Sequence, residues 1–451
     1  MRTPQNDPLK PKIKTLHLVS LGCARNLVDS EFMLGQLLNS GWVFAQDPDE
    51  AEVIIINTCS FIESAIEESI DTILELASYK QHGACKRLIV AGCLPERFRE
   101  EIVDSLPEVD IFLGTGAYDA IGSVVEGALD VSGCFCPDPN FKLPQTSDAP
   151  RVRTSLHSAY LRIAEGCSRH CTYCIIPKLR GLQRSRPLTD IVPEAKLMID
   201  SNIRELILIS QDTTNYGRDL VPPMDLSRLL EKMSDLSEKV WIRFLYGHPN
   251  SIDEKIIRTV AAHPNICSYF DIPIQHASEP VLKKMGRKYS QDDLQRLFEK
   301  IKSTALNAAL RTTVIVGFPG ETDRDFETLL SFVEDLRFDH LGVFTYSDAD
   351  DLPSHGLADH VPSRIAKQRL HTIMSSQAKI SAENNQNRIG SVYKTLVESG
   401  PKDKLFTGRT YFQAPEVDGI TYITSEKLQT GTFVEVKVTE ATEYDLIGEI
   451  P

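Results

Sequence analysis

The chain has 451 residues, of which 41% are hydrophobic and 25% are charged, and its formal net charge is −14. This length predicts two or three domains. The acidic balance argues against a large non-specific nucleic-acid surface, because such binding depends on lysine and arginine neutralising phosphates. No apolar run is long enough to cross a bilayer, and residues 1–12 lack the apolar stretch of a secretory signal, so we expect a cytoplasmic protein that has no membrane partner.

The first domain is expected at residues 13–135, where strand and helix patterns alternate as in a parallel α/β sheet. Its predicted elements are strands at 14–21, 53–57 and 87–91, and helices at 29–39 and 64–77. Residues 136–152 follow as a proline-bearing linker.

A second run of alternating patterns is expected to form a central domain at residues 153–386. Its strand patterns lie at 159–163, 205–210, 240–245, 269–273, 311–316 and 341–344, and a long polar helix follows at 364–388. Six consecutive strand–helix units predict a partial (βα)-barrel. The last domain, residues 387–451, consists of short β runs separated by turns, which predicts a small β-barrel.

The strongest chemical motif is a CxxxCxxC loop formed by Cys167, Cys171 and Cys174 after a predicted strand. Three thiolates can hold a 4Fe–4S cluster and leave one iron open for a cofactor or substrate. The alternative is a zinc knuckle, but zinc sites usually draw four ligands as two CxxC-like pairs, and no fourth ligand is nearby in the sequence.

Three further cysteines each follow a predicted strand of the first domain: Cys23, Cys59 and Cys93. The carboxyl ends of parallel strands lie side by side, so these thiols are expected to converge. We interpret them as a second three-thiolate cluster site, against the alternative that each is an ordinary buried cysteine. The other four cysteines receive no role: Cys85, Cys134, Cys136 and Cys267.

A basic segment at residues 178–187, together with Arg162 and Arg169, is expected to stabilise an anionic partner or a cofactor carboxylate near the CxxxCxxC loop. A solvated run of charges is the alternative. Gln211 and Gly317 end two predicted strands of the central domain and are expected to face a cofactor; the glycine would allow a close approach to the backbone. His276 is interpreted as a structural histidine.

The motifs together resemble a known family. CSRHCTYCIIP (167–177) and RGLQRSRP (180–187) are similar to the radical S-adenosylmethionine core, and three upstream segments are similar to the N-terminal domain of methylthiotransferases. Those segments are SLGCARNLVDSE (20–31), NTCSFIESA (57–65) and AGCLPER (91–97). The resemblance extends from about residue 13 to residue 451. It implies an N-terminal α/β domain, an open (βα)6 partial TIM barrel and a C-terminal TRAM β-barrel.

The resemblance also implies two 4Fe–4S clusters, S-adenosylmethionine, and an electron donor of the flavodoxin or ferredoxin type. One cluster would be held by Cys167, Cys171 and Cys174, and would cleave the cofactor to a radical that abstracts hydrogen. The auxiliary cluster, held by the three strand-end cysteines of the first domain, would carry the transferred sulfur. Tyr173 stands at the aromatic position of the loop and, with Gln211 and Gly317, is assigned to S-adenosylmethionine. No catalytic residue is assigned beyond the cluster ligands.

The family has one branch that modifies adenosine in tRNA and another that methylthiolates an aspartate β-carbon of the twelfth small-subunit ribosomal protein. The segments QAPEVDG (413–419) and EYDLIGE (443–449) resemble the second branch. Residues 390–451 hold six basic and ten acidic residues, which suits a basic ribosomal protein better than RNA phosphates. We therefore expect this ribosomal protein as substrate and do not favour RNA contact. The alternatives are a tRNA methylthiotransferase and a non-catalytic iron–sulfur binding module.

Overall fold

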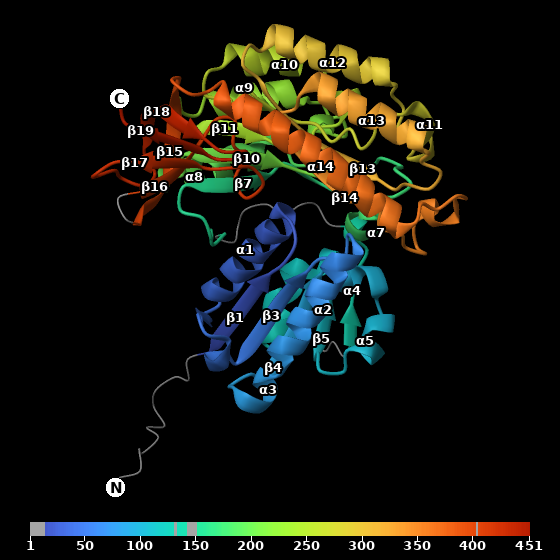
Figure 1. Cartoon of the computed structure of the whole chain (residues 1–451). Helices are drawn as coiled ribbons and strands as arrows, with labels where there is room; N and C mark the ends of the chain where they lie inside the picture. The colour runs from blue at the N-terminus through green and yellow to red at the C-terminus, as the bar shows by residue number, and fades with distance from the viewer. Residues whose placement is uncertain (1–13, 130–132, 142–150, 403–404) are drawn as a thin grey trace. The chain divides into compact units, whose positions relative to one another are not determined.

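The computed structural model describes residues 14–129, 133–141, 151–402 and 405–451 (Figure 1). The predictions for residues 1–12 and for the linker at 142–150 therefore concern residues outside this description. The chain divides into two compact units. The first contains Met1–Thr154 and Lys178–Arg180, and the second contains Ser155–Pro177 and Gly181–Pro451. Within the described ranges, no helix is both long enough and apolar enough to span a bilayer.

The first unit is built on a six-stranded parallel sheet of order β2-β1-β3-β4-β5-β6. The three predicted strands are confirmed as β1 (Thr15–Ser20), β3 (Val53–Thr58) and β4 (Arg87–Gly92). Three shorter strands complete the sheet: β2 (Val43–Phe44), β5 (Ile111–Leu113) and β6 (Gly133–Phe135). Strand β6 includes Cys134, and the irregular chain begins after Phe135.

Helices cover both faces of this sheet, as in other parallel sheets. Val53 and Ile55 of β3 pack in one hydrophobic cluster, whereas Ile54 and Ile56 pack in another. The predicted helices are α1 (Ala24–Asn39), which begins earlier than expected, and α2 (Glu63–Ala77). The remaining helical segments are η1 (Pro48–Glu50), α3 (Tyr79–His82), α4 (Cys93–Phe98), α5 (Glu101–Ser105), η2 (Thr115–Ala120), α6 (Ile121–Val125) and η3 (Pro139–Phe141).

The second unit contains the six predicted central strands in two parallel sheets. One sheet has the order β11-β10-β7 and the other has the order β12-β13-β14. Their bounds are β7 (Ser158–Arg162), β10 (Glu205–Ile209), β11 (Trp241–Phe244), β12 (Tyr269–Asp271), β13 (Ala309–Val316) and β14 (His340–Thr345). A bridge between Ile242 and Ile266 continues the pairing from β11 toward the second sheet. This is the predicted open (βα)6 arrangement.

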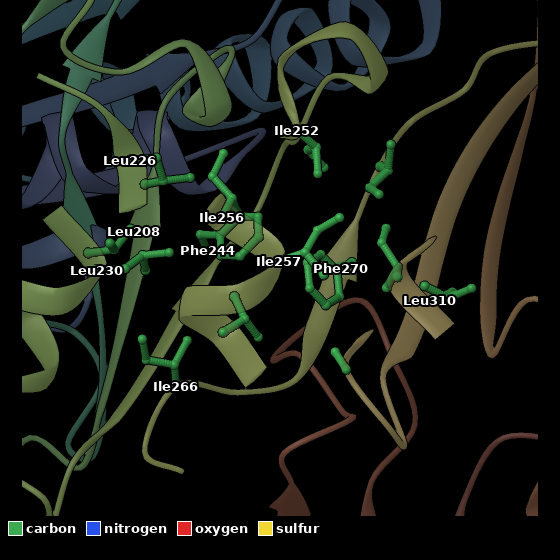
Figure 2. Packing of buried hydrophobic residues seen from close by; sticks show 14 of the residues in the cluster. Leu208, Leu226, Leu230, Phe244, Ile252, Ile256, Ile257, Ile266, Phe270 and Leu310 are labelled. Atoms are coloured by element: carbon green, nitrogen blue, oxygen red, sulfur yellow. The ribbon is translucent and has the colours of Figure 1, made fainter. Parts of the chain in front are cut away.

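Helices follow the central strands and bury their apolar faces against them. They are α8 (Leu188–Asp200), α9 (Leu226–Ser234), α10 (Glu254–Ala262), α11 (Glu279–Lys284), α12 (Gln291–Thr304) and α13 (Asp323–Leu336). Figure 2 shows Phe244 and Phe270 of the strands packed beside Leu226, Ile256 and Ile257. The short elements of this region are β8 (Ala164–Glu165), β9 (Arg184–Ser185), η4 (Thr213–Asn215), η5 (Pro249–Ser251) and η6 (Pro353–Gly356). The short helix α7 (Ile176–Arg180) begins in the second unit, and its last three residues belong to the first.

The chain ends in a small closed β-barrel, which follows the long helix α14 (Ser363–Gln386) and confirms the prediction. Its strand order is β15-β16-β17-β19-β18. The bounds are β15 (Val392–Lys402), β16 (Leu405–Thr410), β17 (Thr421–Thr424), β18 (Phe433–Ala441) and β19 (Leu446–Glu449). The barrel interior is filled by Val397, Phe406, Ile423 and Val436.

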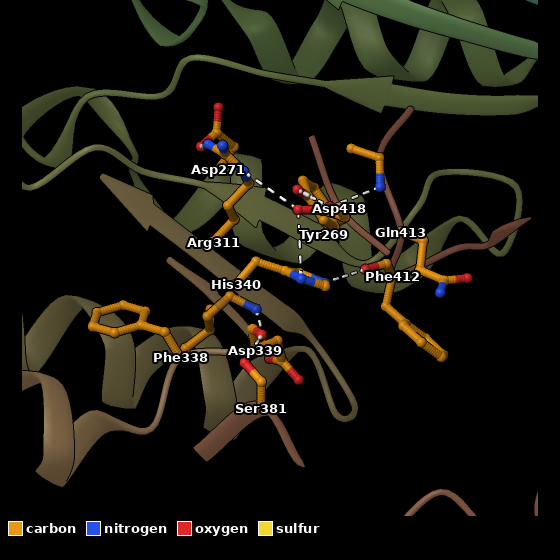
Figure 3. Close-up of polar contacts among 12 residues, drawn as sticks. Tyr269, Asp271, Arg311, Phe338, Asp339, His340, Ser381, Phe412, Gln413 and Asp418 are labelled. Atoms are coloured by element: carbon orange, nitrogen blue, oxygen red, sulfur yellow. Dashed lines mark hydrogen bonds and ion pairs between the residues drawn. The ribbon is translucent and has the colours of Figure 1, made fainter. Parts of the chain in front are cut away.

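Polar contacts attach this barrel to the central strands within the second unit (Figure 3). The Tyr269 hydroxyl donates to Asp418 Oδ2 at 2.6 Å, and Arg311 Nε lies 3.5 Å from Asp418 Oδ1. His340 Nε2 lies 2.7 Å from the carbonyl oxygen of Phe412. The segment 413–419 therefore anchors one domain on another, and its aspartate is buried.

Candidate functional site

The three strand-end cysteines of the first unit lie at one edge of its sheet. Cys23 follows β1, Cys59 follows β3 and Cys93 follows β4. These strands are neighbours in the parallel sheet, so their carboxyl ends meet. In the ladder Thr58 pairs with Gly92, which brings the ends of β3 and β4 level. The structure therefore brings together the three thiols that the strand pattern predicted to converge.

Two glycines with positive φ permit this close approach. A Cβ on Gly22 (φ +88°) would lie 2.7 Å from the Cβ and 3.1 Å from the Sγ of Cys59. A Cβ on Gly92 (φ +103°) would lie 2.4 Å from the side-chain oxygen of Asn57. Any other residue at either position would both strain the backbone and displace a neighbour.

A buried polar framework surrounds these thiols. Asn26 donates to the carbonyl of Thr58 at 2.9 Å. Arg180, which belongs to the first unit, donates to Asn26 Oδ1 at 2.6 Å and to the Sγ of Cys93 at 3.7 Å. Its guanidinium also pairs with Asp29 at 2.5 Å, and both side chains are at most 4% exposed. A cation is thus fixed beside a thiol that would be negative as a metal ligand.

The three thiols influence one another electrostatically. Burial raises the pKa of Cys93 to about 12, although Arg180 acts in the opposite direction. Burial also raises the pKa of Cys59, and the charge of Cys23 adds to that increase. Burial opposes ionisation of Cys23 too, but Arg25 and the backbone N–H of Asn26 outweigh it and hold its pKa below the usual value. Mutual repulsion of this kind requires that the sulfur atoms lie close together.

The other three cysteines occupy the loop between β8 and α7 in the second unit. Cys167 N–H donates to the Gly181 carbonyl at 3.0 Å, and Cys174 N–H donates to the Cys171 carbonyl at 3.2 Å. Burial raises the pKa of Cys174 to about 12, and the charges of Cys171 and Cys167 raise it further. The loop therefore folds its three thiols toward one another. A Cβ on Gly166 (φ +80°) would lie 2.1 Å from the Leu182 carbonyl oxygen, so glycine is required where the loop begins.

Contacts from distant segments fix this loop at the carboxyl ends of the central strands. Thr172 N–H donates to the Met285 carbonyl at 3.2 Å, and its hydroxyl donates to the Lys284 carbonyl at 2.8 Å. Arg169 Nε donates to Asp212 Oδ2 at 2.8 Å, which ties the loop to the residues that follow β10. The loop conformation thus depends on tertiary contacts as well as on its own sequence.

The residues assigned to S-adenosylmethionine occupy different surroundings. The Tyr173 hydroxyl accepts a hydrogen bond from Arg287 Nε at 3.1 Å, and its ring meets the edge of Phe318. Burial raises the pKa of Tyr173 well above its ordinary value, so the phenol stays protonated. Gln211 Nε2 donates to Glu165, whereas its Oε1 is buried and has no hydrogen-bond partner among the described residues.

Gly317 ends β13 with a positive φ of +77°. A Cβ there would lie 2.4 Å from the Cβ of Ala366 in α14, so the space on that side is already filled. Its N–H donates to Glu321, and burial raises the pKa of Glu321 to about 7. The close approach at this glycine is therefore made by a helix of the protein itself, and its contact with a cofactor stays a prediction.

His276 is fully buried. Its Nδ1 accepts the Ser278 N–H at 2.9 Å, and burial lowers its pKa to about 3, so the ring is neutral. Its Nε2 has no partner among the described residues, which differs from a fully satisfied structural histidine.

Four arginines of the basic patch predicted around residues 178–187 are paired with carboxylates of the protein and so do not offer unpaired charges to an anionic partner. Arg180 and Arg186 are buried and pair with Asp29 and Glu194 respectively. The two flanking arginines are also paired: Arg162 with Glu165, and Arg169 with Asp212. The stabilisation of a cofactor carboxylate by this segment stays a prediction.

Sequence reasoning missed the residues that support the thiols. Asn26 and Arg180 carried no metal-ligand signal, because neither is a thiolate, imidazole or carboxylate. The available signal for Asn26 was its place in the first turn after Cys23, where asparagine often binds backbone groups.

Two unassigned cysteines, Cys85 and Cys267, are buried. The other two, Cys134 and Cys136, lie with their Sγ atoms 3.2 Å apart.

The donor sets fit iron–sulfur clusters. In the described part of the chain, no three His, Cys, Asp or Glu side chains are arranged to share one metal ion. A 4Fe–4S cluster needs a different arrangement, because each cysteine thiolate binds a different iron atom of the cluster. The thiolates therefore do not converge on a single ion. Two separate groups of three neighbouring, unpaired thiols, none of them in a disulfide, meet that demand.

Three family models match the chain in order. They are the uncharacterized protein family UPF0004 at residues 15–114, the radical SAM superfamily at 161–333 and the TRAM domain at 389–450.

Curated relatives match over nearly their whole length. The ribosomal protein uS12 methylthiotransferase RimO of Desulfosudis oleivorans is 50% identical over 96% of this chain and 99% of its own. The protein of the same name from Clostridioides difficile is 46% identical over 96% of this chain and 98% of its own. Among solved structures, the radical S-adenosylmethionine methyltransferase TsrM from Kitasatospora setae aligns with a TM-score of 0.57 at 12% identity, covering 82% of this chain and 89% of that one, which supports the fold.

Proposed function

The chain belongs to the family of ribosomal protein uS12 methylthiotransferases, and from this we propose that it methylthiolates the β-carbon of an aspartate in that ribosomal protein. The observation that carries the proposal is identity of 43–50% to enzymes of this name along almost the full chain. The tRNA-modifying alternative and the non-catalytic alternative are not favoured, because the similarity to these enzymes extends through all three domains.

The surface charge of the last domain supports a basic protein substrate. Among the described charged residues of 390–451, the side chains of Arg409 and Asp418 are buried within the second unit. One of these charges is positive and the other is negative. If both are left out of the count, residues 390–451 still have four more acidic than basic residues. Complementary fields of this kind favour association with a basic partner.

Six cysteines would hold the two 4Fe–4S clusters of this enzyme: Cys167, Cys171 and Cys174 for the radical cluster, and Cys23, Cys59 and Cys93 for the auxiliary one. When bound, the clusters and S-adenosylmethionine supply the low-potential electron, the radical, the methyl group and the sulfur. The protein contributes position and electrostatics. Arg180 offsets negative charge at Cys93, and the bond from Arg169 to Asp212 holds the radical-site loop at the strand ends.

The buried Oε1 of Gln211 is available to accept a hydrogen bond from a polar group of S-adenosylmethionine. Tyr173 would line the same site through its backbone and ring, because its hydroxyl is already bound by Arg287. A flavodoxin- or ferredoxin-type protein would deliver the electron, in the cytoplasm where the ribosomal substrate is found.

The substrate proposal is tested by mass spectrometry of the ribosomal protein from strains with and without this gene. We expect one methylthio group on one aspartate, present only when the gene is present. Nucleoside analysis of tRNA from the same strains is the control. Loss of a methylthio-adenosine, with an unchanged ribosomal protein, would overturn the proposal in favour of the tRNA branch.

The two-cluster assignment makes a separate prediction. Replacing Cys23, Cys59 and Cys93 with alanine should remove about half of the iron while S-adenosylmethionine cleavage by the reduced protein persists, because each site binds its metal on its own. The matched variant, with Cys167, Cys171 and Cys174 replaced, should also retain about half of the iron but lose cleavage. Loss of all iron from the first variant would contradict two independent sites.

A further inference from the structure

Two cysteines that belong to neither cluster group lie side by side at the edge of the first unit's sheet. Cys134 is in β6, the edge strand after β5, and Cys136 follows that strand directly. Side chains two residues apart in an extended segment point to the same face. Their Sγ atoms are accordingly 3.2 Å apart. Both residues are only half-buried, so a small reagent can reach them.

This pair adjoins the helix that begins at the third auxiliary-site cysteine. The Cys136 thiol donates to the carbonyl oxygen of Pro95 at 3.5 Å, and Pro95 is two residues after Cys93 in α4. Arg99 Nη1 donates to the Cys136 carbonyl at 3.1 Å, which fixes the backbone there. Because β6 is parallel to the rest of the sheet, Cys136 lies at the same carboxyl edge as the auxiliary thiols.

The two thiols are chemically unequal. The contact between the two sulfur atoms lowers the pKa of Cys134 and raises the pKa of Cys136. The thiolate is the nucleophile in every step of sulfur exchange, so the second cysteine must itself lose its proton when it resolves the product. The Pro95 carbonyl accepts the Cys136 S–H, so Cys134 is the sulfur that attacks first, and Cys136 lies close enough to attack it afterwards.

We propose that Cys134 and Cys136 are a sulfur-acceptor pair that takes the outer sulfur of a small persulfide and releases it as hydrogen sulfide beside the auxiliary site. The inference rests on the proposed function, since every methylthiolation consumes one sulfur atom that a donor must supply. The sulfur atom would then come from a small persulfide, or from a reaction that produces one.

Two steps complete the transfer. The Cys134 thiolate attacks the outer sulfur of R–S–SH, the S–S bond of the donor breaks, and R–S⁻ leaves and takes up a proton. Cys136 then attacks the Sγ of the Cys134 persulfide, so that a Cys134–Cys136 disulfide forms and the outer sulfur leaves as HS⁻ with the Cys136 proton. The sulfur gains two electrons and the cysteines lose two. The Sγ–Sγ distance shortens from 3.2 Å to about 2.05 Å, and a small dithiol then reduces the disulfide.

The test uses the full-length protein with reconstituted clusters and glutathione persulfide that is isotopically labelled in its outer sulfur, without oxygen. In the wild type we expect labelled hydrogen sulfide and a Cys134–Cys136 disulfide in the tryptic peptide. In Cys136→Ser we expect the label to remain on Cys134 as a persulfide, with hydrogen sulfide release reduced at least tenfold. In Cys134→Ser we expect neither product.

Equal sulfide release by the wild type and the Cys134→Ser/Cys136→Ser double variant would overturn the inference, as would an unlabelled Cys134 in Cys136→Ser. Cys85→Ala is the matched control, because this thiol lies in the same unit away from the pair and should leave release unchanged. Iron content verifies that both clusters are present in each variant. When free sulfide is added, the double variant should methylthiolate the ribosomal protein at the wild-type rate. Failure of the wild type in that assay would instead reject the proposed function.

Discussion

Gly22 and Gly41 have nearly the same φ angle but different surroundings. Their φ angles are +88° and +86°. A Cβ on Gly22 would lie 2.7 Å from the Cβ of Cys59, whereas a Cβ on Gly41 would meet nothing within 4 Å. Substitutions at these two glycines therefore distinguish two effects. At Gly41 only the positive φ destabilises the variant, whereas at Gly22 the added Cβ also displaces a thiol that is proposed to bind the auxiliary cluster.

Gly22→Ala should lose about half of the bound iron, because the added methyl group pushes Cys59 away from Cys23 and Cys93. Gly41→Ala should retain its iron and lose only about 1–2 kcal/mol of stability, the cost of the left-handed conformation for a residue with a Cβ. Iron and acid-labile sulfide are measured after identical reconstitution. Equal iron in both variants would show that the contact with Cys59 does not control the cluster site.

The residues themselves were predictable from sequence to different degrees. The six cysteines could be grouped because each lies in a recognisable local context, either a strand end or the CxxxCxxC loop. Arg180 could not be placed, because its partners Asn26 and Asp29 are about 150 positions earlier in the chain. The same reason explains why the pairing of Arg162, Arg169 and Arg186 was not predicted: charge alone does not show which guanidinium groups lie beside buried carboxylates.

At the scale of elements, α1 is unusual because it buries a polar face. Asp29 and Glu31 of this helix are 1% and 4% exposed. Asp29 pairs with Arg180, and Glu31 accepts hydrogen bonds from Arg151 Nε at 2.6 Å and from Thr154 N–H at 2.8 Å. Buried carboxylates require such partners, because an unpaired buried charge is strongly unfavourable. The partners therefore bind α1 to segments far along the chain.

Arg180→Met should lower the stability of α1 by about 3 kcal/mol or more, because it leaves Asp29 buried without its counter-charge. The double variant Arg180→Met/Asp29→Leu should be more stable than Arg180→Met alone. Arg151→Met should have a smaller effect, since Thr154 still binds Glu31. Hydrogen exchange at the α1 amides measures each change, because a protein of two units need not unfold in one step. If the effects of Arg180→Met and Asp29→Leu simply added in the double variant, a direct interaction between these two side chains would be contradicted.

Element prediction succeeded where a pattern was long enough. The strands β1, β3 and β4 each have six residues, and their apolar runs identified them. The strands β2, β5 and β6 have only two or three residues and rely on the neighbouring strands, so their sequences carry no periodic signal. This omission also hid the relation between Cys134 and Cys136, because without a predicted strand at residues 133–135 there was no reason to expect the two thiols on one face.

At the scale of the molecule, the second unit combines the open barrel and the C-terminal barrel through a buried network of charges. Glu205 of β10 pairs with Arg243 of β11 at 2.7 Å and with Arg409 of β16 at 2.5 Å. Arg409 also pairs with Glu398 of β15 at 2.5 Å. Burial opposes ionisation of Glu205, but Arg409 and Arg243 outweigh it and lower its pKa to about 2. One carboxylate thus neutralises cations from two domains.

The lowered pKa makes this junction sensitive to pH in one direction. An unfolded glutamate has a pKa of about 4.3, so Glu205 contributes its full stabilisation above that value. The contribution is lost progressively as the pH falls from about 4.3 toward about 2. A shift of about two units corresponds to about 3 kcal/mol, which is an order-of-magnitude figure for a buried pair.

Glu205→Gln should therefore destabilise the second unit at pH 7, because Arg243 and Arg409 keep their charges in a buried setting without this carboxylate. The difference in Tm between the wild type and the variant should be constant from pH 7 to pH 5 and should shrink below about pH 4, where the wild type begins to lose the same charge. Glu254→Gln is the matched control. Glu254 also pairs with two cations, Arg258 and Lys300, and they lower its pKa, but its side chain is exposed to solvent, so its replacement should leave Tm nearly unchanged. Equal Tm values for Glu205→Gln and the wild type at pH 7 would show that hydrophobic contacts alone join the two barrels.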